Sequence, residues 1–158
     1  MELRRYFTYA FAALTMVFVQ SCDLESSDNG DLDGMWQMES VDTLATGGHL
    51  DMHNTGRIWC FQGKLAELRQ AGIGKYSWDN QPLMCKFERE GSTLTMGNFI
   101  VSDRAPVDNS EPDPKVEDVE LLKPYGINVL EESFRIEKLN SSTMILESTL
   151  LRLSFRKY

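Results

Sequence analysis

The only two histidines of the chain lie close together, in the segment His49-Leu50-Asp51-Met52-His53. In a strand, residues 49, 51 and 53 would share one face, and in a helix the two histidines would lie one turn apart. Imidazole nitrogens and a carboxylate are ligands that zinc accepts. Glycines on both sides, however, leave the segment in a polar loop that fixes none of these side chains. We therefore expect no metal site.

The shortage of histidine also argues against hydrolytic chemistry. A triad needs a nucleophile, a base and an orienting group, and no serine stands in a Gly-x-Ser-x-Gly elbow. The neighbouring carboxylates of Glu131 and Glu132 would point to opposite faces of a strand, whereas an acid–base pair must share one cavity. No Gly-rich phosphate loop follows a strand and opens a helix. We expect no catalysis and no cofactor.

Cys60 and Cys85 are the two cysteines outside the N-terminal region. They are either inward-facing apolar residues of strands or the two halves of a disulfide, which a compartment outside the cytosol would permit. If a full strand separates theirs, the Cα atoms lie about 10 Å apart, too far for a disulfide. We favour free thiols, and the bridge stays an alternative.

The composition limits the remaining classes of function. The chain has 158 residues, the usual size of one domain, with 16 Lys and Arg against 24 Asp and Glu and a net charge of −8. Nonspecific binding to nucleic acid needs clustered positive charge, so this balance argues against it. With 42% apolar and 10% aromatic residues, the chain is globular rather than disordered.

The N-terminus has the form of an export signal. A pair of arginines precedes an apolar run, residues 6–19, which is too short for a transmembrane helix but suits the core of a signal peptide. The run ends at Val19-Gln20-Ser21-Cys22, which resembles a bacterial lipobox, in which the cysteine is acylated and becomes the first mature residue. We expect residues 1–21 to be a lipoprotein signal peptide and Cys22 to carry lipid such as palmitate. An uncleaved anchor and an ordinary secretory signal are the alternatives.

Residues 22–33 are acidic and rich in Ser and Gly, which predicts a flexible tether ahead of a domain over residues 34–158. Acidic residues directly behind an acylated cysteine also resemble the surface-export signals of some gut-dwelling Gram-negative lipoproteins, although a plain tether looks the same. We expect a protein anchored by lipid in the bacterial cell envelope, in the outer membrane, at its periplasmic face or on the cell surface.

The domain alternates apolar and polar residues in short runs, the pattern of half-buried strands. The run 64–69 also fits a helical spacing, but only two residues separate it from an aromatic strand, so we predict a hairpin. The predicted strands are residues 34–41, 57–61, 64–69, 83–89, 93–96, 132–137, 143–147 and 151–156.

Loops rich in Gly, Pro and acidic residues separate these runs. They are residues 43–56, 71–80, where a short strand is an alternative, and 98–115. Asp113-Pro114 has the form of an N-cap followed by proline at the first helical position. It predicts one short helix over Lys115–Leu122, which ends at Pro124.

Seven or eight short strands with one helix predict an all-β fold, an antiparallel barrel whose closure removes exposed sheet edges. Such a barrel holds either interdigitated side chains or one small ligand. A lining of methionine and aromatic side chains would suit a flat or lipidic apolar ligand. The inward-facing residues that we expect to line this site are Met38, Ile58, Phe87, Met96, Phe134, Ile136, Met144 and Phe155.

Gly34-x-Trp36 resembles the Gly-x-Trp signature of lipocalins and the wider calycin superfamily, and Arg152 or Arg156 near the end of the last strand matches the second half of that pattern. Residues 116–158 also look like the C-terminal half of lipocalin-like domains in bacterial envelope lipoproteins, which are largely without assigned function. The middle lipocalin signature, a Thr-Asp-Tyr-like turn, is not found. The resemblance implies a lipocalin-like barrel in which Trp36 plugs one end beneath an arginine, for which we favour Arg156.

This closure implies an order of stabilities. Loss of a buried tryptophan ring costs about 3–5 kcal/mol. Trp36→Ala is then expected to lower the melting temperature far more than Trp59→Ala or Trp78→Ala, with Arg156→Ala between them.

Two functions from different classes remain. The first is that of a lipid-anchored envelope protein that binds a small apolar molecule in its lipocalin-like barrel. The second is that of a non-catalytic structural or protein-interaction lipoprotein, whose barrel is filled and whose acidic loop 98–115 contacts an envelope partner that the sequence does not identify. A small molecule that co-purifies with the protein would favour the first.

Overall fold

The computed structural model describes residues 27–71, 82–102 and 113–158. The predicted signal peptide over residues 1–21, the predicted lipidation site Cys22, nearly all of the loop predicted over 71–80 and most of the loop predicted over 98–115 lie outside these ranges.

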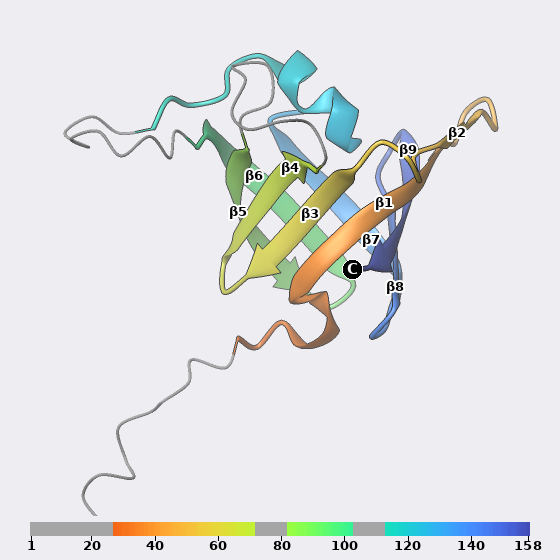
Figure 1. Cartoon of the computed structure of the whole chain (residues 1–158), viewed down its shortest axis with the longest axis horizontal. Helices are drawn as coiled ribbons and strands as arrows, with labels where there is room; N and C mark the ends of the chain where they lie inside the picture. The colour runs from red at the N-terminus through yellow and green to blue at the C-terminus, as the bar shows by residue number, and fades with distance from the viewer. Residues whose placement is uncertain (1–26, 72–81, 103–112) are drawn as a thin grey trace, which may run out of the picture.

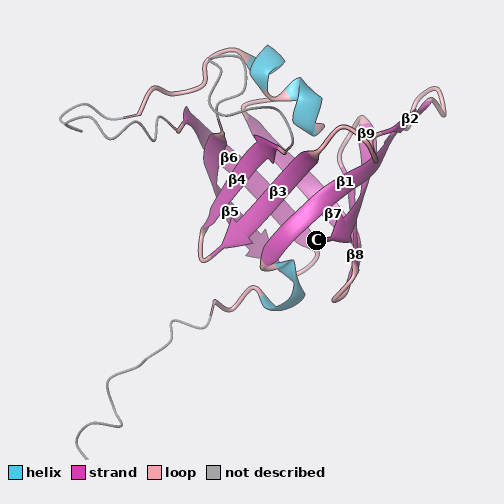
Figure 2. Cartoon of the chain, in the orientation of Figure 1, coloured by secondary structure: helices cyan, strands magenta, loops and turns pink. Residues whose placement is uncertain are grey.

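Strands make up most of the described chain, and the helical segments are short 3-10 turns (Figure 2). The strands are β1 (Gly34–Thr43), β2 (His49–Asp51), β3 (Arg57–Gln62), β4 (Leu65–Gln70), β5 (Leu83–Glu90), β6 (Thr93–Val101), β7 (Glu131–Leu139), β8 (Thr143–Glu147) and β9 (Leu151–Lys157). The helical turns are η1 (Gly30–Leu32), η3 (Val119–Leu121) and η4 (Lys123–Tyr125). None of these helical segments is long and apolar enough to cross a bilayer.

Eight of the strands close into an antiparallel barrel (Figure 1). From β3 to β9 each strand pairs with the next, β1 pairs with β3, and β9 returns to pair with β1. β2 lies outside this ring, where it pairs with the second half of β1 to form a projecting hairpin. The predicted antiparallel barrel of about eight strands is therefore confirmed.

The predicted strands recur with small shifts at their ends, but two loops are shorter than predicted. The stretch 43–56 contains β2, which pairs with β1. β6 continues to Val101, so the prediction of a loop from residue 98 is wrong at its start. The physical reason is the burial of Phe99 in the core, and Asn98 before it adopts a φ of 56°.

The predicted short helix is present, but its position and form differ. In place of one helix over Lys115–Leu122 there are two successive 3-10 turns, η3 and η4. Lys115 instead forms an isolated β-bridge with Ile100, and the cap of η3 is Asp118, whose side chain accepts a backbone N–H. Pro124 lies in the first turn of η4 rather than ending a helix, because its fixed φ and missing N–H suit that place.

The turns η3 and η4 cover one end of the barrel, which we call the capped end (Figure 1). Leu122, Tyr125 and Ile127 of this segment are buried in the core. Gly126 has a φ of +79°, and a Cβ added there would lie 2.7 Å from Leu153 Cδ2 of β9. The cap is therefore packed closely against the barrel at a position that only glycine suits.

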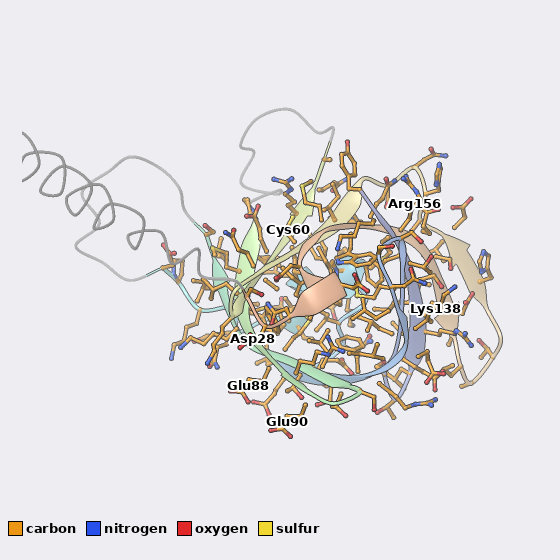
Figure 3. All side chains as sticks on the ribbon, turned by 90° about the horizontal axis from the view of Figure 1, so that it is seen from below. Asp28, Cys60, Glu88, Glu90, Lys138 and Arg156 are labelled. Atoms are coloured by element: carbon orange, nitrogen blue, oxygen red, sulfur yellow. The ribbon has the colours of Figure 1, made fainter. Side chains whose placement is uncertain are left out.

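The opposite end, which we call the floor, is closed by residues that the sequence pattern assigns to the tether. Figure 3 looks at this end and shows η1 lying across it. Leu32 is fully buried, Asn29 Nδ2 donates to Gly63 O over 2.7 Å, and Arg89 Nη1 donates to Asn29 O over 3.1 Å. The predicted domain boundary at residue 34 is therefore wrong, since folded structure is present from Ser27. The barrel and both of its closures lie within residues 27–158, so we expect this segment to fold alone.

Candidate functional site

The barrel interior is built from alternate residues of its strands. Ile136, predicted to line a ligand site, is half-buried and packs against the core. The predicted lining residues that are themselves buried in this core are Met38, Phe87, Met96, Phe134, Met144 and Phe155.

Ile58 does not face the interior, and this part of the predicted lining is wrong. It lies opposite Gln37 and Arg69 in the sheet, and residues directly opposite one another share a face. The interior positions of β3 are Trp59 and Phe61. Residues 58–61 are all apolar, so the sequence does not show which of them face the interior. In the next strand, β4, residues 66–69 alternate apolar and polar, and pairing β3 with β4 through their hairpin would have shown which residues of β3 face inward.

Trp59 lies at the centre of the interior. Its ring centroid is 6.1 Å from that of Phe61, 5.7 Å from that of Phe134 and 4.9 Å from that of Phe155. Phe61 in turn meets Phe87 edge to face at 5.1 Å. Tilted and edge-on pairs of this kind are favoured by the ring quadrupoles. One aromatic cluster thus joins β3, β5, β7 and β9.

Side chains fill this interior. A void large enough for a water molecule would leave part of the neighbouring side chains accessible. No accessible surface remains on Trp36, Met38, Trp59, Leu68, Leu94, Met96, Phe134, Met144, Leu146 and Leu153, which are all 0% exposed. The structure therefore has no preformed cavity beside these residues.

One polar atom of the interior lacks a partner. Trp59 Nε1 is buried and donates no hydrogen bond within the described residues. A buried donor left unpaired costs about 1–3 kcal/mol. A molecule with a hydrogen-bond acceptor would relieve this cost if it reached Trp59.

The floor is organised around Trp36, which is fully buried. Trp36 Nε1 donates to Leu32 O over 2.8 Å. Lys157 Nζ lies 4.6 Å from the centre of the Trp36 ring and donates to the carbonyl oxygens of Asp31 and Asp33. A cation therefore covers the tryptophan, as the lipocalin resemblance implies, but the cation is a lysine.

Arg156 does not cover Trp36, and that prediction is wrong. The pairing of β1 with β9 closes the barrel, and we call it the seam. Across the seam, Arg156 lies opposite Gln37, on the outer face of β1. Arg156 Nη2 donates to Gln37 Oε1 over 3.0 Å, and Arg156 Nε lies 3.2 Å from Glu39 Oε1. Figure 3 shows Arg156 away from the barrel axis. The pairing of the seam decides this, because Lys157 is the residue opposite Trp36.

A groove of about 530 Å³ opens at the capped end. We call it the mouth groove, and it is lined by Met52, Asn54, Thr55, Arg57, Gln70, Ala71 and Pro124. Arg57 Cζ lies 4.9 Å from the centre of the Tyr125 ring. Burial raises the pKa of the Tyr125 hydroxyl, and the Arg57 charge offsets part of that rise.

A second groove, of about 600 Å³, lies at the floor. It mixes charges of both signs, with Asp28, Glu88 and Glu90 on one side of the barrel (Figure 3) and Lys64 and Arg89 beside them. Across the described ranges, no group of three or more His, Cys, Asp or Glu side chains is placed to hold a metal ion.

The two histidines each contact a different carboxylate. His49 Nδ1 lies 2.5 Å from Asp42 Oδ1, and His53 Nδ1 lies 3.1 Å from Glu39 Oε2. The carboxylate of Asp51 accepts the backbone N–H of His53. His49, Asp51 and His53, considered above as zinc ligands, therefore make local contacts on the outside of the barrel.

Cys60 and Cys85 are free thiols, as favoured above. β4 lies between their strands, with Cys60 opposite Glu67 and Cys85 opposite Ala66. Neighbouring residues of β4 point to opposite faces, so Cys85 faces inward and Cys60 outward. Burial raises the pKa of Cys85 to about 12 and also raises the pKa of Cys60. Neither thiol is activated for reaction.

Comparison with known proteins agrees with this geometry. A family model described as a lipocalin-like domain matches residues 15–158. A lipocalin-like protein from Bacteroides uniformis superposes with a TM-score of 0.59 at 19% identity, covering 82% of this chain and 100% of that one. An uncharacterized protein from Bacteroides eggerthii superposes with a TM-score of 0.52 at 13% identity, covering 80% and 99%. No curated protein sequence matches the chain.

Proposed function

The chain belongs to the family of lipocalin-like domains, and from that premise we propose that it is a non-catalytic binding protein held at the bacterial cell envelope by lipid on Cys22. A lipocalin-like barrel is compatible with ligand binding, but the interior of this barrel is filled. The filled interior is the observation that carries the proposal: the barrel acts as a rigid scaffold that offers its outer surface to an envelope partner.

The predicted lipid on Cys22 would place the two ends of the barrel in different surroundings. Cys22 stands five residues before Ser27, which lies at the floor. A lipid on Cys22 therefore turns the floor toward the membrane and the capped end away from it. Two acyl chains suffice for stable anchoring, since each buried CH₂ contributes about 0.8 kcal/mol.

Five of the exposed large apolar side chains belong to loops and turns of the capped end, away from the predicted anchor. Leu44 and Leu150 are joined by a backbone hydrogen bond of 2.9 Å. The exposed apolar residues on the loops and turns of this end are Leu44, Leu121, Val129, Leu130 and Leu150. Contiguous exposed apolar surface marks sites that contact proteins, and Leu44 and Leu150 are neighbours of this kind, so we propose the capped end as the contact surface.

Crosslinking in the intact envelope tests this proposal. A photoreactive residue at Leu150 is expected to capture a partner protein. Its matched control is the same residue at Ser141, in the turn between β7 and β8 at the floor, where no capture is expected. Equal capture at both positions, or none at Leu150, would contradict a partner-binding capped end.

A small apolar ligand inside the barrel is the second candidate, and the unpaired Trp59 N–H favours it. Such a ligand would have to displace the cap and insert among the methionine and aromatic side chains. Native mass spectrometry of the full lipidated protein distinguishes the two candidates. We expect only the mass of the lipidated chain. A retained small molecule that is lost from Trp59→Phe, which keeps a ring but not the donor, would establish the second candidate instead.

A further inference from the structure

The mouth groove contains a cation that no carboxylate neutralises among the described residues. Arg57 forms no salt bridge there, and its guanidinium is held instead over the ring of Tyr125, 4.9 Å from the ring centre. This contact uses one face of the guanidinium and leaves donors at its edge.

The strand pairing places Arg57 on the inner side of the barrel rim. Arg57 is two residues before Trp59, and successive residues of a strand alternate between faces, so both face inward. Its partner on β4 is Gln70, which therefore shares that face. The guanidinium and the amide are thus neighbouring hydrogen-bond donors within one groove.

The other walls of the groove are of two kinds. Met52, Ala71 and Pro124 provide apolar surface, and Met52 is only 7% exposed. Asn54 and Thr55 stand at the rim, where Thr55 Oγ1 donates to Met52 O over 2.7 Å. The groove therefore combines a cationic donor group with an apolar wall, in a volume of about 530 Å³ that suits a small molecule.

We propose that the mouth groove binds a small carboxylic acid with an apolar body, whose carboxylate is held by Arg57 and Gln70 and whose body lies against Met52, Ala71 and Pro124. Charge-assisted hydrogen bonds between a guanidinium and a carboxylate are roughly twice as strong as neutral ones. The planar fork of arginine also matches the two oxygens of a carboxylate, which a lysine cannot do. This site is separate from the filled interior, and it lies at the same end of the barrel as the partner surface proposed above.

Titration of residues 27–158 with octanoate, followed by nuclear magnetic resonance and calorimetry, tests the site. The resonances of Thr55, Arg57 and Gln70 are expected to shift while those of Trp59 and Phe155 in the interior do not. Octanol has the same apolar body without the charge, and acetate has the charge without the body. Both are expected to bind at least about tenfold more weakly than octanoate.

Arg57→Gln is expected to weaken octanoate binding at least about tenfold and to leave octanol binding unchanged. Lys86→Gln, an exposed cation on the outer face of β5, is the matched control and should leave both unchanged. If Arg57→Gln fails to fold, the comparison of octanoate with octanol on the unaltered chain decides. Equal binding of the two probes would overturn the proposal, as would octanoate shifts confined to the interior, which would indicate a ligand inside the barrel instead.

Discussion

Lys157 and Trp36 lie opposite one another across the seam of the barrel, with the ammonium nitrogen 4.6 Å from the centre of the indole ring. The same ammonium donates to the carbonyl oxygens of Asp31 and Asp33. The penultimate residue of the chain therefore fastens the segment that leads to the predicted lipid. The floor is one unit made from both ends of the sequence.

This unit predicts a revised order of stabilities for the floor. Trp36→Ala should cost about 3–5 kcal/mol of unfolding free energy, because a fully buried ring is lost. Lys157→Ala should cost less, about 0.5–2 kcal/mol, and Arg156→Ala at most about 1 kcal/mol, because its ion pair with Glu39 is exposed. Urea unfolding of the three variants measures the order. An Arg156→Ala cost above that of Lys157→Ala would contradict the assignment of the covering cation.

Trp59→Ala should be as harmful as Trp36→Ala, contrary to the order that the sequence implied. Trp59 is also fully buried and contacts three phenylalanine rings. We expect a loss of about 3–5 kcal/mol, measured by urea unfolding beside the floor variants. Trp78, the other tryptophan of that comparison, lies outside the described residues.

Removal of residues 27–33 should destabilise the barrel. A chain that begins at Gly34 lacks Leu32, which is fully buried, and leaves Trp36 Nε1 without its acceptor. A buried leucine alone accounts for about 2–5 kcal/mol. The measurement compares thermal unfolding of chains that begin at Ser27 and at Gly34, with Leu32→Ala in the longer chain as the control. Equal stability of the two chains would restore the tether boundary at residue 34.

Gly126→Ala should destabilise the cap more than Gly91→Ala destabilises its hairpin. Both glycines have positive φ, +79° and +58°, so alanine at either costs about 1–2 kcal/mol of backbone strain. Only at Gly126 does the added Cβ meet another side chain, at 2.7 Å from Leu153 Cδ2, while at Gly91 nothing lies within 4 Å. Overpacking of this kind adds about 1–3 kcal/mol. Equal losses in urea unfolding would show that the cap is not packed against β9.

Cys85 should resist alkylation in the folded protein. Its pKa of about 12 leaves about one thiolate in ten thousand at pH 8. Because burial raises this pKa from its ordinary value of 9.0, the Cys85 thiol is protonated in both the folded and the unfolded chain below pH 9, and stability is then fully kept. Between pH 9 and 12 the unfolded thiol ionises while the folded one does not, so this part of the stability is lost as the pH rises. Iodoacetamide labelling with mass spectrometry should show Cys85 modified only in urea. Labelling of native Cys85 at the rate of an unfolded thiol would contradict its burial.

Cys22→Ala should abolish lipidation and release the protein from the lipidated membrane fraction. Only acylation of Cys22 would attach the mature chain to lipid in the proposed arrangement. Metabolic labelling with a clickable fatty acid measures this directly, with Cys60→Ala as the control that keeps its label. Equal label on wild-type protein and Cys22→Ala would refute the lipid anchor.

The sequence predicted the barrel because most of the eight runs alternate apolar and polar residues and strong turn signals separate them, as at Gly91. The sequence did not show which of two neighbouring strand residues faces inward where both are apolar or both are basic. Ile58 next to Trp59, and Arg156 next to Lys157, each leave the phase of a strand open, and only the pairing across the sheet decides it. The mouth groove brings together Arg57, Gln70 and Pro124 from three separate segments, so no local pattern could indicate it.

The seam between β1 and β9 also governs when the molecule can form. Its pairs join Trp36 to Lys157 and Thr43 to Leu151, so the first and last strands of the barrel must meet. Contacts between residues so far apart in the sequence form slowly, because the chain loses the entropy of closing a long loop before these contacts stabilise the fold. The ring cannot close until β9, residues Leu151–Lys157, has been synthesised. An emerging chain therefore stays open along this seam, with the edge of β1 that β9 will cover left unpaired while all the strands between them are being made.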